Sequence, residues 1–177
     1  DGTEQLWRMD EEGETLILSW HVLDNVYPVS FLADNRQIYL LSDAEESVNF
    51  LSLYRFDVET GEKVFEESDP EGKADFDNLM ISDKTLEILF TSYTYDRTRR
   101  YFRNAEFENH FNLVAGILQG RETAFFSPTL DESLWLVSAY SDTDPGSVYL
   151  YNTATKELTF QYQPRPEMPV EHLSPVK

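Results

Sequence analysis

The sequence predicts an all-β fold: a partial β-propeller of about three and a half four-stranded blades, with one short helix near residues 105–118. Two repeating features predict it. An aspartate opens the second apolar run of three successive units, 49 and 48 residues apart: Asp34, Asp83 and Asp131. A polar residue closes the third run, with spacings of 47, 47 and 48: Asp10, Asp57, Asn104 and Asn152. A period in the forties with four strands per unit is typical of propeller blades.

The stretch 122–163 shows one unit in full. Four short runs of β-branched, aromatic and aliphatic residues are separated by clusters of Asp, Pro, Gly, Ser and Asn. These turn-forming residues fix φ, allow positive φ or make local side-chain hydrogen bonds, so the pattern predicts a four-stranded antiparallel meander. A lone meander leaves one hydrophobic face uncovered, and for that reason the unit is expected to recur.

The repeat divides the chain into five parts: a half blade (1–25), a blade (26–70), a blade with a helix (71–120), a blade (121–163) and a Pro-rich linker (164–177). The first part holds two predicted strands, Gln5–Met9 and Thr15–Trp20, around a turn over Asp10–Gly13. They match the third and fourth runs of a blade, so the inner pair is expected upstream or from the other chain end. Since the chain starts at Asp1 and not at Met, we expect a processed product or an excised piece.

In the complete units the sequence predicts the individual strands. The blade at 26–70 has four predicted strands: Tyr27–Leu32, Gln37–Ser42, Phe50–Asp57 and Glu62–Glu66. Its last hairpin turns at Glu59–Gly61, where glycine can take positive φ. The next unit begins near Phe76, and its second run is Leu86–Thr94.

One segment departs from the strand pattern. Apolar residues with helical spacing (i, i+4, i+7 and i+11) predict an amphipathic helix over Ala105–Leu118, where the fourth run of a blade would stand: Phe107, Phe111, Val114 and Leu118. Gly120 is expected just beyond its C-terminus. His110 lies on the flank of this helix, where a structural role is expected.

Composition limits the partners. The net charge of −19 argues against nucleic acid and anionic membranes, because phosphate groups need a basic surface. It suits a cationic partner or simply a well-solvated surface. There is no cysteine and no apolar run near the roughly 20 residues of a membrane span. We expect a soluble protein, and the sequence leaves a cytoplasmic or a periplasmic location open.

A basic cluster stands out in this acidic chain. Four arginines fall within seven residues: Arg97, Arg99, Arg100 and Arg103. One interpretation is a binding site for a carboxylate, such as a peptide terminus, held by bidentate hydrogen bonds. The other is an arginine-rich strand that pairs with neighbouring acidic strands.

Catalytic motifs are missing from the sequence. No Gly-x-Ser-x-Gly elbow occurs, and none of the three histidines has an HExxH partner or metal-ligand spacing. Asp142 and Asp144 faintly resemble a calcium loop, but the Pro-Gly that follows favours a tight turn between strands. Phosphate-binding and dinucleotide-binding glycine loops are also missing. We therefore expect no catalytic residue, no metal site and no cofactor in this chain.

Four segments, in order and spacing, resemble the N-terminal propeller of prolyl oligopeptidase family serine peptidases, in the acylaminoacyl-peptidase or dipeptidyl-aminopeptidase-like branch: Tyr93–Arg103, Ala105–Leu118, Leu134–Tyr151 and Glu171–Pro175. The resemblance implies an α/β-hydrolase domain that begins just beyond Lys177 and carries a Ser-Asp-His triad. In that family the propeller admits short peptides and excludes folded proteins. The chain departs from the family in having about three and a half blades in place of a full ring.

Three hypotheses follow. The first is a non-catalytic propeller fragment that restricts substrate access and supports the hydrolase domain, with peptides as substrates. The second is a stand-alone propeller that scaffolds protein partners. The third, a glycan-acting propeller, is disfavoured because sialidase-type Ser-x-Asp-x-Gly-x-Thr-Trp boxes are missing. Open blade edges also predict self-association.

Overall fold

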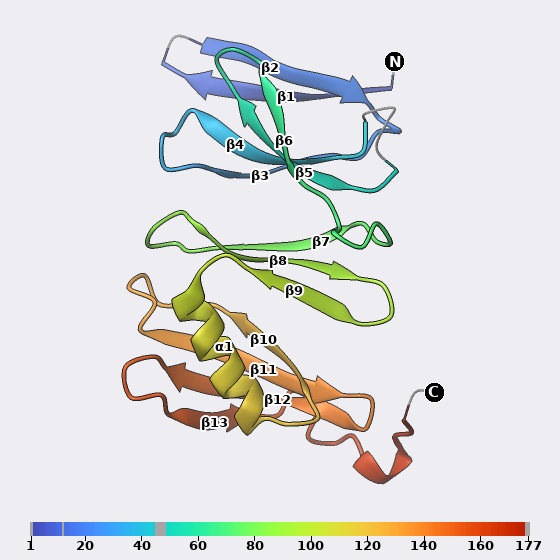
Figure 1. The fold of residues 1–177 in the computed structure, drawn as a ribbon, viewed down its shortest axis with the longest axis vertical. Coiled ribbons are helices and arrows are strands. Elements are labelled where there is room, and N and C mark those ends of the chain that lie inside the picture. The colour runs from blue at the N-terminus through green and yellow to red at the C-terminus, as the bar shows by residue number, and fades with distance from the viewer. Residues whose placement is uncertain (1, 12, 45–48, 176–177) are drawn as a thin grey trace. The chain divides into compact units, whose positions relative to one another are not determined.

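The computed structural model describes residues 2–11, 13–44 and 49–175. Its strands form four antiparallel sheets of two, four, three and four strands in chain order, and one α-helix follows the three-stranded sheet (Figure 1). This confirms the all-β, partial propeller fold of about three and a half blades with one short helix. Glu12 of the predicted first turn, and the last two residues, lie outside the described part.

Contacts divide the chain into two compact units, residues 1–80 with 86–101, and residues 81–85 with 102–177. The first unit holds nearly all of the first nine strands: β1 (Thr3–Asp10), β2 (Gly13–His21), β3 (Val26–Phe31), β4 (Gln37–Ser42), β5 (Ser52–Asp57), β6 (Lys63–Glu67), β7 (Phe76–Ile81), β8 (Ile88–Thr94) and β9 (Thr98–Phe102). The second holds the remaining elements: α1 (Ala105–Ile117), β10 (Glu122–Phe126), β11 (Leu134–Ser141), β12 (Asp144–Asn152), β13 (Leu158–Tyr162) and the 3-10 turn η1 (Val170–His172).

In both four-stranded sheets, the polar residue that closes the third run caps the turn that follows it. The side chain of Asp57 accepts hydrogen bonds from the backbone N–H groups of Glu59 and Thr60, both at 2.9 Å. Asn152 binds the N–H groups two and three residues further on in the same way, at 2.9 and 3.0 Å. Asx turns of this kind lead from the third strand of a sheet into the fourth. A polar residue is therefore needed at the end of the third run of successive units, which explains its regular spacing.

In the unit with the helix, the residue at the same repeat position, Asn104, starts the helix. The side chain of Asn104 accepts the backbone N–H of Phe107 at 2.9 Å, and Asn104 itself has extended φ and ψ, as an N-cap residue does. Helix α1 therefore replaces the fourth strand at the point where the other units make their Asx turn. Gly120 follows the helix with a φ of +79°, as expected for a residue just past the helix end.

Two of the aspartates that open the second run, Asp34 and Asp131, also cap turns, whereas at the turn of Asp83 the hydroxyl of Ser82 accepts the N–H groups of Lys84 and Thr85. Asp34 accepts the N–H groups of Arg36 and Gln37, at 3.0 and 2.9 Å. Asp131 accepts hydrogen bonds from the hydroxyl of Thr129 and from both the N–H and the hydroxyl of Ser133. These bonds lower the pKa of Asp131 to about 2. The carboxylate is therefore charged throughout the neutral range.

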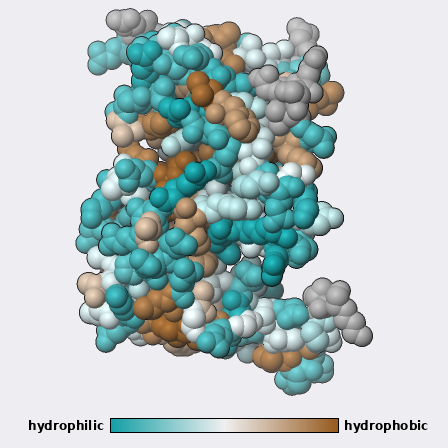
Figure 2. All heavy atoms as spheres, viewed as in Figure 1, coloured by the Kyte–Doolittle hydropathy of each residue, from teal (hydrophilic) through white to brown (hydrophobic). Residues whose placement is uncertain are grey.

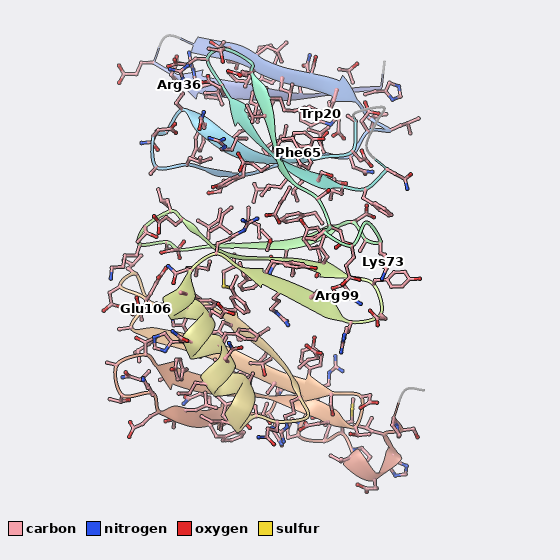
Figure 3. All side chains as sticks on the ribbon, viewed as in Figure 1. Trp20, Arg36, Phe65, Lys73, Arg99 and Glu106 are labelled. Carbon is pink, nitrogen blue, oxygen red and sulfur yellow. The ribbon has the colours of Figure 1, made fainter. Side chains whose placement is uncertain are left out.

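In the first unit, a hydrophobic core lies between the β1–β2 hairpin and the β3–β6 sheet. Five buried residues of the sheet form it: Val26, Ile38, Leu40, Tyr54 and Phe56. The hairpin covers them with Leu6, Ile17, Leu18 and Trp20. Figure 3 shows Trp20 at this hairpin. Apolar burial of this kind is the main source of stability in a sheet module.

In the second unit, α1 covers one face of the β10–β13 sheet (Figure 1). The ring of Phe107 lies 5.3 Å from the rings of both Phe125 and Trp135, and Phe111 lies 5.6 Å from Phe125. Such aromatic contacts add to the stability gained by burial. The apolar face of α1 thus contacts the inner strands of the adjoining sheet.

The turn between β11 and β12 is shorter than the Ser-Asp-Thr-Asp-Pro-Gly cluster suggests. Ser141 pairs with Asp144, and only two residues lie between them. Pro145 and Gly146 belong to β12, where the strand register shifts. A bulge tolerates proline in a strand because the ladder is already interrupted there.

Candidate binding site

The predicted basic cluster lies on and around β9. Arg97 is exposed in the bend before the strand, and Arg99 and Arg100 are successive residues within it. Successive side chains of a strand point to opposite faces of the sheet. One carboxylate therefore cannot be held by Arg99 and Arg100 together. Arg103 follows β9 and belongs to the second compact unit.

Arg99 is engaged by acidic residues. Its Nε lies 2.9 Å from a carboxylate oxygen of Glu71, and its Nη2 lies 2.7 Å from Asp96. The hydrogen bond to Asp96 is the main reason why the pKa of Arg99 is raised. Glu71 also binds Lys73, with 2.8 Å between Nζ and Oε2; Figure 3 shows Lys73 and Arg99 close to one end of the β7–β9 sheet. For Arg99 these contacts favour the interpretation of an arginine paired with acids.

Arg100 and Arg103 each interact with other groups as well. Arg97 is different, because the guanidinium of this exposed residue makes no ion pair with an acidic residue within the described part of the chain. Of the four arginines, Arg97 is therefore the one most available to an external carboxylate.

The loop that carries Glu71 and Lys73 is held by a buried aspartate. The carboxylate of Asp69 accepts three backbone N–H groups, from Glu71, Lys73 and Ala74, at 2.8 to 3.1 Å. Burial acts to raise the pKa of Asp69, but the three donors outweigh it and the pKa is lowered. The charged carboxylate thus fixes the loop next to β9.

A small cavity of about 300 Å³ lies beside this loop. Its lining combines one lysine, two aspartates and two aromatic rings with smaller groups: Phe50, Lys73, Ala74, Asp75, Phe76, Asp77 and Thr94. The hydroxyl of Thr94 donates to Asp77 at 2.9 Å, and Asp75 accepts the N–H of Leu51 at 2.8 Å. A cavity with both charges and an apolar wall can hold a small polar group, such as the end of a peptide.

His110 of α1 packs against Tyr151 of the adjoining sheet, as expected for a structural role. Its Nδ1 lies 2.7 Å from the hydroxyl of the buried Tyr151, and the two rings are 5.6 Å apart. Burial lowers the pKa of His110 and raises the pKa of Tyr151, so burial favours the neutral form of both partners in this hydrogen bond. Within the described residues, no histidine is hydrogen-bonded to a serine or threonine hydroxyl, and no group of three metal-ligating side chains is found.

The lowered pKa of His110 predicts that the stability of the folded chain depends on pH. Because the pKa of His110 is lower in the folded chain than its usual 6.5, the unfolded chain binds the proton more readily. The stability that neutral His110 contributes is therefore fully present above about pH 6.5. It is lost as the pH drops from there toward the pKa of His110 in the folded chain. We expect the urea midpoint to fall between pH 8 and pH 5, and His110→Gln to reduce this fall. His21→Gln, on an exposed histidine, is the matched control; an unchanged pH profile in His110→Gln would contradict the assignment.

The sequence does not predict the contact between the polar stretch at residues 68–74 and β9, which Glu71 makes with Arg99. Contacts between residues so far apart in the sequence depend on how the β7–β9 sheet receives the loop, and no local pattern records that.

No protein-family model matches the sequence, and no curated protein matches it. Among the described residues, no helix is long and apolar enough to cross a membrane.

Proposed function

We propose that this chain is the non-catalytic propeller part of a serine peptidase that resembles the prolyl oligopeptidase family. In this role it restricts substrate access and supports an α/β-hydrolase domain that cleaves short peptides. The observation that carries the proposal is the order of elements from β8 to α1. The arginine-rich β9 is followed at once by an N-capped helix in place of a fourth strand, within the segment on which the resemblance depends.

The site chemistry is compatible with a peptide-handling surface. The cavity beside the loop at residues 69–74 is lined by two aspartates and by Lys73, whose ammonium is also paired with Glu71, and Arg97 lies exposed in the bend before β9. Opposite charges in one site suit a dipolar ligand such as a short peptide, whose ammonium and carboxylate ends need different partners. In this proposal the nucleophile and its base come from the hydrolase domain.

The proposal is tested with the protein encoded by the complete reading frame. We expect that protein to hydrolyse short chromogenic peptides and to leave a folded protein substrate intact. We expect residues 1–177 alone to bind without hydrolysis. A reading frame that continues only into further blades, or that has no Gly-x-Ser-x-Gly elbow, would overturn the proposal and favour a scaffold that binds protein partners.

Two single substitutions test the role of the arginines in the full-length enzyme. Arg97→Ala should raise KM for short peptides with a free carboxylate about threefold to tenfold, since it removes a charge-assisted contact. Arg99→Ala should leave KM nearly unchanged, because Glu71 and Asp96 already occupy this guanidinium. The opposite ranking of the two variants would show that the carboxylate contact is not at Arg97.

A further inference from the structure

The Pro-rich tail after β13 forms one wall of a cavity of about 490 Å³ in the second unit. Within residues 164–175 only Met168 and Leu173 are half-buried, and both line this cavity. Backbone hydrogen bonds turn the tail, from the N–H of Met168 to the carbonyl of Arg165 at 3.2 Å and from the N–H of Leu173 to that of Val170 at 3.0 Å. The tail thus withdraws from solvent the same side chains that line the cavity.

The other wall is the end of the β11–β12 hairpin, on the face of the sheet opposite α1. Trp135 of β11 contacts Phe107 of α1, with ring centroids 5.3 Å apart. Since successive side chains of a strand point to opposite faces, Ser138 and Tyr140 lie on the other face. Val148 pairs with Ser138 and is only 4% exposed. Val148 is therefore buried on a face that α1 does not cover, where the cavity and the tail lie.

Most of the cavity wall is apolar. The hairpin and the tail supply its apolar side chains: Pro145, Val148, Pro164, Met168 and Leu173. Figure 2 shows hydrophobic atoms among hydrophilic ones in the tail. A cavity of this volume, with apolar walls and a few polar groups, is typical of sites for small organic ligands. Because the flexible thioether of methionine packs well against rings, the wall at Met168 suits an aromatic group.

The charged residues of the lining differ in what they offer to a ligand. Among the described residues, three of them line the cavity: Asp142, Asp144 and Arg165. Asp144 is paired with Arg121, with 2.8 Å between its carboxylate and Nη2, and it accepts the N–H of Gly146 at 2.9 Å. Asp142 interacts with other groups as well. The guanidinium of Arg165 makes no ion pair and no hydrogen bond within residues 2–11, 13–44 and 49–175, so the charge most available to a ligand is positive.

We propose that this cavity binds a carboxylate that carries an aromatic group, such as the C-terminal phenylalanine of a peptide or a free arylalkanoic acid. Arg165 pairs with the carboxylate through charge-assisted hydrogen bonds. The hydroxyl of Tyr140, which makes no hydrogen bond within the described part of the chain, is a second donor. The aromatic group lies against Met168. This inference does not depend on the proposed function, because Arg97 and the cavity beside residues 69–74 belong to the first unit.

Ligands that differ in one group test the proposal on the 177-residue chain. Isothermal titration calorimetry should show saturable binding of N-acetyl-L-phenylalanine. N-acetyl-L-phenylalaninamide, which lacks the charge, and N-acetylglycine, which lacks the ring, should each bind at least about tenfold more weakly. Binding should also slow amide hydrogen exchange in residues 164–173. Absence of binding by N-acetyl-L-phenylalanine, or equal binding of the acid and its amide, would overturn the proposal.

Two further probes distinguish a peptide terminus from a free acid. The tripeptide acetyl-Ala-Ala-Phe and 3-phenylpropionate share the carboxylate and the ring, so both should bind. Tighter binding of the tripeptide identifies a peptide terminus as the ligand, and tighter binding of 3-phenylpropionate identifies a free acid. Failure of both to bind would contradict the proposal.

Substitutions of Arg165 locate the carboxylate. Arg165→Ala should weaken binding of N-acetyl-L-phenylalanine about fivefold to tenfold and remove the preference for the acid over the amide. Arg165→Lys should keep part of that preference, because an ammonium also pairs with a carboxylate. The fold should tolerate both changes, since Arg165 is exposed. Arg8→Ala, at an exposed arginine of the first unit, changes the net charge equally and should bind as the unmodified chain does. Equal binding by the Arg165→Ala and Arg8→Ala variants would refute the site.

Discussion

Phe107→Ala is expected to destabilise the second unit by about 3–5 kcal/mol, the usual cost of removing a buried phenylalanine ring. Phe107 is 6% exposed and contacts the rings of Phe125 and Trp135. Alanine would leave a cavity between α1 and the sheet, and it would also remove the aromatic contacts. The helix is then held mainly by Phe111 and Val114.

Urea unfolding monitored by tryptophan fluorescence measures this loss, because Trp135 lies directly against Phe107. Ile117→Ala on the same helix is the matched control: Ile117 is exposed, and the change should stay within about 0.5 kcal/mol. Equal effects of the two substitutions would mean that α1 does not pack on the β10–β13 sheet through its Phe107 face.

Leu40→Ala should destabilise the first unit by about 2–5 kcal/mol. Leu40 is 1% exposed and belongs to the core between the β1–β2 hairpin and the β3–β6 sheet. The cost combines the lost burial of the side chain with the cavity left among Ile38, Tyr54 and Phe56. A cavity at this point also weakens the packing of the β1–β2 hairpin on the sheet.

The same urea experiment serves here, with Trp20 as the reporter, since it packs against this core. Leu130→Ala is the matched control, because it removes the same atoms from an exposed position and should change stability by less than about 0.5 kcal/mol. A loss below 1 kcal/mol in Leu40→Ala would contradict a packed interface between hairpin and sheet.

Much of the fold could be predicted from the sequence because its signals are local. Several of the repeated polar residues cap a turn with their own side chains, as Asp57 and Asn152 do. The spacing of Phe107, Phe111 and Val114 predicts the helix, and all three are buried. The N-cap role of Asn104 was readable as well, because asparagine is a preferred N-cap residue and the helix pattern begins directly after it.

The remaining features depend on contacts that no local pattern records. The turn at Asp142–Thr143 is shorter than its sequence suggests, because Pro145 is accommodated at a register shift within β12. The four arginines look equivalent in the sequence, yet Arg99 is paired with acids while Arg97 is exposed in a bend. Such differences arise from which strand edge or loop meets each side chain in three dimensions.

The measurement that tests the central claim most directly is active-site labelling of the full-length protein with a fluorophosphonate, a reagent for activated serines. The proposed function predicts labelling of one serine, in a Gly-x-Ser-x-Gly sequence beyond residue 177. Residues 1–177 alone should remain unlabelled. A full-length protein that takes up no label, or a label attached to a serine within residues 1–177, would contradict the account.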